Sequence, residues 1–256
     1  MNLKRLYLEK NLCYKTGEII KPAGIMVHST GANNPTLRRY VPIPTEKINP
    51  NNWNQPTPGN KKVCVHAFIG KLADGTIATY QTLPWSMRGW HSGRGSKGSA
   101  NKNFIVFEIC EDWLNDREYF EAVYKEAVEL CVYLCKKFNI KVENIICHSE
   151  GYKMGIASNH ADVMHWFPRF GKSMATFRAD VKKGLEYEVE SMTKEELKEF
   201  IEQTVKNMGV GEPVSPWAKD FVEDAKELGI TDGSNPQRLA TRQEVMIMAM
   251  RAAEKK

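Results

Sequence analysis

The sequence predicts an α/β protein with a mixed central β-sheet flanked by helices, followed by a small all-α region. Three observations predict this fold class. Short apolar runs bounded by glycine, proline and polar residues recur through residues 1–187, as the strands of a buried sheet do. Apolar residues recur at helical spacing near 116–138 and 173–185. After residue 187, short segments with helix-start signals replace the strands.

Five apolar runs predict the strands. They are GIMV (24–27), VCVHAFIG (63–70), TIATYQT (76–82), FIVFEI (104–109) and IIC (145–147). The second and third runs alternate in polarity around the turn Ala73-Asp74-Gly75, which predicts a β-hairpin. We expect the helix at 116–138 to cover the sheet and the helix at 173–185 to close the domain.

A domain boundary is predicted between residues 1–187 and 188–256, at the connecting segment 186–192. The second part is expected to be a small helical domain. Its helix signals are capping boxes at Thr193–Glu196 and Thr241–Glu244, and Ser215-Pro216 as a helix start with Gly229 as the stop.

The composition is that of a soluble globular protein. The chain has 256 residues and 42% hydrophobic content, enough to bury at least one full core. No run approaches the roughly 18 apolar residues of a membrane helix, and the first residues lack the apolar core of a secretory signal. We therefore expect neither membrane insertion nor export through the general secretion route.

The net charge of +5 is unevenly distributed. Residues 188–256 carry 10 basic and 14 acidic side chains, or −4, whereas residues 1–187 carry 26 basic and 17 acidic, or +9. The first part therefore favours a polyanionic setting. The basic residues are dispersed without a recognition motif for nucleic acid, so no nucleic-acid partner is predicted. An anionic polymer such as a bacterial wall fits the charge.

The six cysteines are scattered, and four of them lie in apolar strand or helix patterns. This distribution favours reduced thiols in the core over a disulfide framework. Cys131 and Cys135 are four residues apart, but they fall on the apolar face of the helix expected at 116–138. Packing is therefore favoured over metal binding for this pair.

Half of the six histidines lie in the stretch 144–166. His148 is expected at the carboxyl end of a strand, where α/β sheets open into their sites. The glycine-containing segment after it can fold back and bring His160 beside it. Catalytic zinc sites generally combine three protein ligands with a position for water, so one more donor is needed. His28, at the end of the first apolar run, is the best candidate.

Two loops are expected to form a substrate groove. The Pro/Asn-rich stretch 33–62 is long for a loop inside a compact domain and directly follows His28, so it is expected to wall one side. Trp85, Trp90 and His91 lie close together beside small polar residues. This pattern suits a sugar or peptide surface better than a core.

Glu108 interrupts the most apolar strand. A glutamate in a buried strand costs on the order of a few kcal/mol unless it is partnered or directed into a site. A functional role is therefore favoured over a structural ion pair. No Ser–His–Asp or Cys–His arrangement competes with it, because Ser149 is only the chain neighbour of His148.

Five segments occur in a characteristic order: His28 in IMVHST, TIATYQTLPW, Trp90-His91, residues 103–109 and the His148 loop. In this order they resemble the zinc-dependent N-acetylmuramoyl-L-alanine amidases of the type shared by phage T7-like lysozyme amidases and peptidoglycan recognition proteins. Within that type, the resemblance is greatest to the endolysins of phages that infect Gram-positive spore formers. The resemblance covers roughly residues 20–183. It implies a peptidoglycan-recognition-like fold and cleavage of the amide between N-acetylmuramic acid and L-alanine.

The resemblance also implies a ligand set for Zn²⁺. His28 matches the first ligand and His148 the second. His160 stands where the family has an aspartate or cysteine as the third. Asp162 and His165 are alternatives for that third place.

The resemblance implies that Glu108 activates the water. Many relatives have a lysine two residues before the third ligand, which stabilises the oxyanion, whereas Ser158 occupies that place here. The remaining candidates for oxyanion or substrate binding are Trp90, His91, Lys153 and His165.

Residues 215–253 are similar to a single S-layer-homology motif, with LGITDG at 228–233 and ATRQE at 240–244. Such motifs imply binding to wall polysaccharide, and the family usually places three in a row. A unit of about 40 residues seldom buries two amphipathic helices alone. Association of two or three copies through residues 188–256 is therefore a second expectation.

The sequence thus predicts a zinc-dependent peptidoglycan amidase, of phage or prophage endolysin type. A module that binds peptidoglycan without cutting it and a zinc peptidoglycan endopeptidase are the alternatives. Synthesis in the host cytoplasm without a signal peptide, and action on the wall after release at lysis, are expected.

Overall fold

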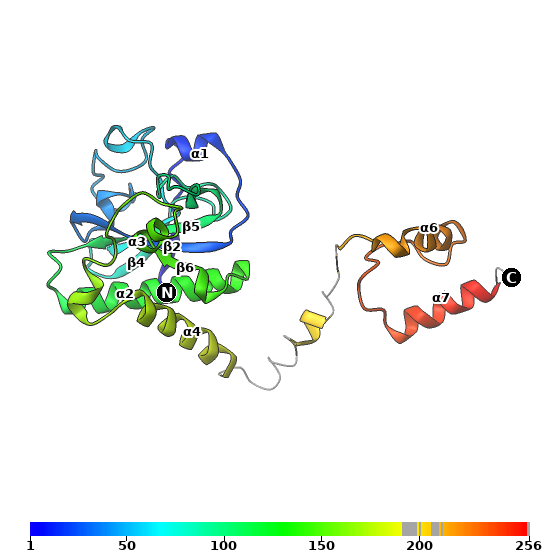
Figure 1. Ribbon diagram of the computed structural model, residues 1–256. Helices are drawn as coiled ribbons and strands as arrows, with labels where there is room; N and C mark the ends of the chain where they lie inside the picture. The colour runs from blue at the N-terminus through cyan, green and yellow to red at the C-terminus, as the bar shows by residue number, and fades with distance from the viewer. Residues whose placement is uncertain (191–198, 200, 206–209, 211, 255–256) are drawn as a thin grey trace. The chain divides into compact units, whose positions relative to one another are not determined.

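In this computed structural model, six strands form one mixed sheet in the first part of the chain (Figure 1). Across the sheet the order is β1 (Leu3–Arg5), β4 (Ile77–Gln81), β3 (Ala67–Lys71), β5 (Phe104–Glu111), β2 (Gly24–Asn33) and β6 (Ile145–Cys147). Neighbouring strands are parallel except β3 and β4, which form the predicted hairpin. The prediction of an α/β fold with a mixed central sheet is confirmed.

The structure describes residues 1–190, 199, 201–205, 210 and 212–254. Their α-helices are α1 (Leu12–Thr16), α2 (Arg117–Phe138), α3 (His148–Lys153), α4 (Met174–Glu190), α6 (Lys219–Glu227) and α7 (Arg242–Glu254). Short 3-10 turns span Leu37–Arg39, Pro58–Asn60, Ala100–Lys102, Val142–Asn144, Phe167–Phe170 and Pro216–Ala218. The capping box expected at Thr193–Glu196 and part of the connecting segment 186–192 lie outside the described residues. Among those described, no helix is long and apolar enough to cross a membrane.

Side-chain alternation along the strands gives the sheet two different faces. One face carries Ile25, Val27 and Phe107 and packs against α2 and α4 in the largest apolar cluster (Figure 1). Fully burying one such side chain stabilises the fold by about 1.5–3 kcal/mol. The opposite face carries Val106 and Phe68 and is covered by the long loop after β2. By the same alternation, the side chains of His28 and Glu108 lie on this second face, so α2 and α4 do not cover them.

The helix that covers the sheet begins and ends at identifiable signals. The Asp116 side chain accepts a hydrogen bond from the Tyr119 N–H at 3.0 Å, which caps the first turn of α2. Asn139, with φ +52°, ends the helix in the left-handed region. An N-terminal cap of this kind contributes about 1 kcal/mol. Both ends agree with the helix predicted at 116–138.

Three local expectations are corrected by the tertiary structure. Trp85, expected on a binding surface, is 5% exposed and stacks on His66 with a centroid distance of 6.2 Å. Cys13 and Cys64, expected as thiols, form a disulfide, because the fold brings these residues to a Cα–Cα distance of 6.4 Å across 51 positions. The other four cysteines are free and buried, as predicted. The segment after Cys147 is the short helix α3 rather than a loop.

The chain separates into two compact units, Met1–Tyr187 and Glu188–Lys256. In the second unit, the predicted capping box at α7 is present. The Glu244 N–H donates to Thr241 Oγ1 at 3.2 Å, and the Thr241 N–H donates to Glu244 Oε2 at 2.7 Å. None of the residues of this unit whose exposure is described is buried.

His66, the residue directly before β3, is buried, and both of its ring nitrogens have partners. Nδ1 accepts from the Val106 N–H at 3.0 Å, and Nε2 lies 2.7 Å from the Met87 carbonyl oxygen. A neutral ring with its proton on Nε2 satisfies both bonds. Burial lowers the pKa of His66 to about 4, so the folded protein holds the ring neutral.

This burial predicts a loss of stability in acid. The folded-state pKa of His66, about 4, lies below the ordinary value of 6.5, so the unfolded chain takes up a proton first as the pH falls. The stability that comes from keeping His66 neutral is fully present above pH 6.5. It is lost as the pH falls towards 4, which lowers the free energy of unfolding by roughly 3 kcal/mol. Urea unfolding of the parent and of His66→Gln across this range tests it. The glutamine side chain does not titrate, so equal pH slopes for the two proteins would contradict the prediction.

Candidate active site

Three neighbouring parallel strands bring the candidate residues to one edge of the sheet. β2 lies between β5 and β6, and in this register His28 is opposite Glu108 while Val27 is opposite Cys147. His148 follows Cys147 directly and begins α3. The carboxyl ends of the three strands therefore place His28, Glu108 and His148 side by side.

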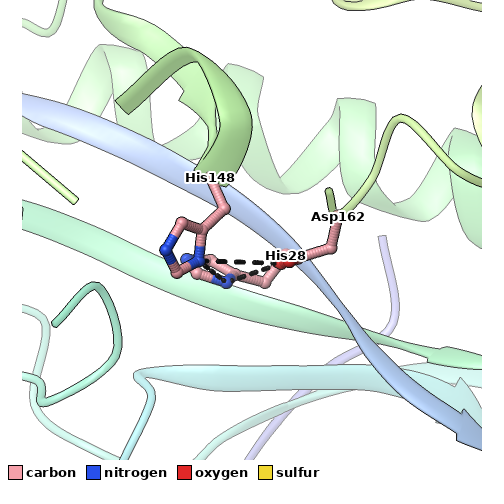
Figure 2. Close-up of side chains that lie close together, drawn as sticks. All are labelled: His28, His148 and Asp162. Carbon is pink, nitrogen blue, oxygen red and sulfur yellow. Dashed lines mark hydrogen bonds and ion pairs between the residues drawn. The ribbon is translucent and has the colours of Figure 1, made fainter. Parts of the chain in front are cut away.

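Asp162 joins the two histidines at this edge (Figure 2). Its Oδ2 lies 2.8 Å from His28 Nδ1 and 4.0 Å from His148 Nδ1. The two Nδ1 atoms are 3.4 Å apart. Both histidines are 3% exposed, so the three donor atoms converge in a nearly enclosed position.

The segment that carries Asp162 is fixed to the rest of the domain. The His148 N–H donates to the Asp162 carbonyl oxygen at 3.2 Å, and the Ser158 N–H donates to the Ser92 carbonyl oxygen at 2.9 Å. The side chains of Val163 and Trp166, which follow Asp162, are fully buried in the main core. The segment 158–166, which brings Asp162 to His28, is thus held at both of its ends.

The charges of the cluster are coupled. Burial opposes a charge on His28, but the hydrogen bond to Asp162 and the nearby carboxylates of Glu108 and Asp162 raise its pKa. Burial would raise the pKa of Asp162, but the bond and charge of His28 lower it. Burial and the neighbouring His28 lower the pKa of His148 to about 4. His148 is therefore a neutral donor at neutral pH, as a metal ligand must be.

Glu108 is a partly buried carboxyl group with an unsatisfied oxygen. Its Oε2 is buried and has no hydrogen-bond partner among the described residues. Burial raises the pKa of Glu108 to about 8; His28 opposes the shift, and Asp162 and Glu111 add to it. A carboxyl group with this pKa can exchange a proton near neutral pH, which a general acid–base group requires.

Other side chains hold the histidines in place. His91 Nδ1 lies 3.2 Å from His28 Nε2, and the His91 N–H donates to Asn101 Oδ1 at 3.0 Å. Ser158 Oγ lies 3.3 Å from His148 Nε2. These contacts leave the Nδ1 atoms of His28 and His148 directed at Asp162.

The donor set fits a zinc ion. Imidazole nitrogens and a carboxylate oxygen are ligands that Zn²⁺ prefers. With metal–ligand bonds of 2.0–2.1 Å, neighbouring donors in a tetrahedral site lie about 3.3 Å apart. The observed separations of 2.8, 3.4 and 4.0 Å bracket this value. The group formed by His28, His148 and Asp162 can therefore hold a metal.

A protein-family model described as N-acetylmuramoyl-L-alanine amidase (Amidase_2) matches residues 20–165. The chain belongs to this amidase family. The match spans every strand and loop that supplies His28, Glu108, His148 and Asp162.

Two curated relatives carry the same description. The N-acetylmuramoyl-L-alanine amidase CwlH of Bacillus subtilis (strain 168) is 37% identical over 71 residues, or 28% of this chain and 27% of the relative. CwlA of Bacillus sp is 31% identical over 70 residues, or 27% and 28%. The chain thus matches under a third of the length of these relatives. The solution structure of the PlyG catalytic domain shares the fold, with a TM-score of 0.50, 22% identity and coverage of 72% of this chain and 96% of that domain.

The residues expected at this amidase-family site take different places. Asp162, an alternative third donor in the sequence analysis, lies with His28 and His148. His160, the first choice for that place, is exposed, and its ring packs on that of His148 at a centroid distance of 4.7 Å. The geometry thus favours Asp162 over His160, because the turn after α3 carries Asp162, and not His160, back over His28.

The remaining candidates lie farther from the cluster. His165 Nε2 is 2.9 Å from Glu111 Oε1, and this bond raises the pKa of His165. Lys153 is exposed at the end of α3 and lines a groove against α4. Trp90 is partly buried against the disulfide of Cys13 and Cys64.

The sequence analysis missed Tyr40, which lies in the long loop after β2. Its ring stacks on Phe68 at 4.8 Å, and Phe68 is opposite Glu108 in the sheet. Burial raises the pKa of the Tyr40 hydroxyl and Glu108 adds to the shift, whereas the neighbouring Thr30 side chain opposes it. No local pattern marks Tyr40, since only the folded loop brings it to the face of Glu108.

Proposed function

We propose that this protein hydrolyses the amide between N-acetylmuramic acid and L-alanine in peptidoglycan. Membership of the N-acetylmuramoyl-L-alanine amidase family supports the reaction class. The observation that carries the proposal is the cluster of His28, His148 and Asp162 next to the unsatisfied carboxyl group of Glu108. An acid–base group beside a set of metal donors is the arrangement that metal-assisted hydrolysis requires.

We propose zinc as the cofactor, held by His28 Nδ1, His148 Nδ1 and Asp162 Oδ2. Zinc supplies a Lewis acid for the scissile carbonyl and lowers the pKa of water to about 7. The chain's own residues determine how this chemistry is oriented. His91 fixes the ring of His28 through Nε2, and Ser158 contacts Nε2 of His148.

Glu108 is the proposed general base and acid. Its carboxylate takes the proton of the attacking water and returns it to the nitrogen of the leaving amine. Burial raises the pKa of its carboxyl group, so Glu108 can hold the proton taken from water until the amine leaves. The proton therefore stays within the site between bond formation and bond cleavage.

His160 is the proposed oxyanion group. In the family that the sequence resembles, a lysine two residues before the third ligand has this role. With Asp162 as the third ligand, that place falls on His160. The imidazole of His160 is exposed beside His148, and His165 is engaged with Glu111. His91 meets His28 through Nδ1, and its Nε2 is buried without a partner among the described residues. His160 thus has a free face for the developing negative charge.

The second unit has two proposed roles at the wall. Its similarity to an S-layer-homology motif supports binding to wall polysaccharide after release of the protein at lysis. Its apolar side chains support association of copies, since Phe221, Met246 and Met250 are each more than 60% exposed. Burying such side chains between copies is favourable by about 25 cal/mol per Å².

Glu108→Gln is expected to lower turnover by a factor on the order of 100 to 10,000 while leaving the metal in place. The amide cannot accept the water proton, and the residue is not in the donor group.

Mass spectrometry of wall digests should show a new amine at L-alanine with the parent protein. A new amine elsewhere supports an endopeptidase, and no product supports a binding module. Glu143→Gln, which removes the same charge at an exposed position, is the control. If Glu108→Gln kept near-parent turnover, Glu108 would have a structural role and not a catalytic one.

Asp162→Ala is expected to lose both metal and activity, because two histidines cannot complete a catalytic zinc site. His160→Ala is expected to keep the metal and lose turnover, and His160→Lys to regain part of it. His165→Ala should keep the metal. Elemental analysis after dialysis and kcat measurement test this set. Metal lost with His160→Ala and kept with Asp162→Ala would place the third ligand at residue 160.

Self-association is expected at tens of micromolar for the full chain and not for residues 1–187. The exposed apolar side chains of the second unit supply the contact, so its removal abolishes it. Sedimentation equilibrium measures both masses. A full chain that stays monomeric rules out association through residues 188–256.

A further inference from the structure

The loop after β2 encloses a polar hollow of about 290 Å³ on the protein surface. Arg38 and Lys47 line it, together with the amide side chains of Asn34 and Asn49. Ile48, 56% exposed, adds an apolar wall. The sequence analysis expected this loop to wall a groove but assigned no residue of it to a ligand.

The two cations of the hollow have no anionic partner in the described part of the chain. Among the described residues, no hydrogen bond or ion pair engages the side chain of Arg38 or Lys47, whereas the neighbouring Arg39 donates to the Asn51 carbonyl oxygen at 3.3 Å. Glu46, the nearest acid along the chain, accepts from the Ala73 N–H at 2.9 Å. Two uncompensated positive charges in one concave site favour an anion.

The walls of the hollow are held by the domain. The Pro35 carbonyl oxygen accepts from the Lys71 N–H at 2.7 Å, where Thr36 pairs with the end of β3. Asn34 Oδ1 accepts from the Thr36 hydroxyl at 2.6 Å. Leu37 is fully buried beneath the loop. A site formed before the ligand arrives loses less conformational entropy on binding.

The hollow lies at the same edge of the sheet as the catalytic cluster. Thr36 is level with Lys71, three residues beyond Phe68 on β3, and Phe68 is level with Glu108. His28 is opposite Glu108 on the next strand. Three residues along a strand and two strand spacings across it give a separation of about 14 Å from His28 to Lys71, the residue beside Thr36.

We propose that this hollow binds a carboxylate of the peptidoglycan stem peptide, about four residues from the scissile amide. An extended peptide advances about 3.4 Å per residue, so four residues span the estimated separation. The guanidinium of Arg38 matches a carboxylate in two hydrogen bonds, and Lys47 adds charge. Ile48 contacts the aliphatic part of the same residue. This inference rests on the proposed amidase function and makes the loop a specificity determinant for the far end of the peptide.

The test compares two muramyl-tetrapeptides that differ only at the last residue, as the free carboxylate or the carboxamide. For the free carboxylate, the double variant Arg38→Gln/Lys47→Gln should raise KM about tenfold at unchanged kcat, since charged hydrogen bonds are lost. For the carboxamide, the same variant should change KM little. Lys61→Gln/Lys62→Gln is the matched control, because these exposed lysines of the same loop lie outside the hollow.

Three results overturn the inference: an unchanged KM, an equal loss for the carboxamide, or an equal effect of the control. Cleavage of muramyl-L-alanine, which is too short to reach the hollow, tests the amidase function separately. If the parent protein cuts no amide, calorimetric Kd values of the full chain for the two tetrapeptides still decide the inference. Equal Kd values for acid and carboxamide then overturn it, and a preference for the acid that the double variant loses supports it. Inhibition by inorganic phosphate, but not by acetate, would instead assign the hollow to a phosphate-bearing polymer.

Discussion

The parallel pairing of β2 with β5 and β6 is the constraint on which the site depends. Its register sets His28 opposite Glu108 and sets Val27 opposite Cys147, the residue before His148, so His28 and His148 are level. A slip of one residue in β2 would turn His28 towards the face that packs against α2, where Ile25 and Val27 now lie. The hydrophobic core therefore fixes the catalytic geometry, because the same alternation that buries Val27 exposes His28 to the loop-covered face.

The site gathers carboxyl groups within a unit of positive net charge. Residues 1–187 have a net charge of +9, yet Glu108 and Asp162 both lie near His28, and Glu111 lies near Glu108. The positive exterior favours approach to an anionic wall, and the carboxylates inside favour a bound cation. The buried, unsatisfied Oε2 of Glu108 costs stability, which the apolar core on the other face of the sheet offsets.

The apolar patterns predict five of the six strands and the helices α2 and α4, and with them the site residues that are tied to strand ends. His28, His148 and Glu108 could be named because each sits in or directly after an apolar run, whose end is a local property. Asp162, the disulfide of Cys13 and Cys64 and the burial of Trp85 could not be fixed in this way. Each depends on where a long connection returns in the fold. The helix α3 and the turn after it decide whether residue 160 or 162 reaches His28, and neither element has a strong local signal.

In the proposed site, the choice of third ligand also decides which residue faces the oxyanion, because the two places are two positions apart on one segment. With Asp162 as the proposed third ligand, the proposed oxyanion place is His160 and not Ser158. A lysine in that place would lose up to about 2 kcal/mol of side-chain conformational freedom when it is fixed. The imidazole of His160 has fewer torsions and packs against His148 at 4.7 Å, so it is oriented before substrate arrives. In the proposed site, a shorter donor held by His148 thus replaces the longer lysine side chain.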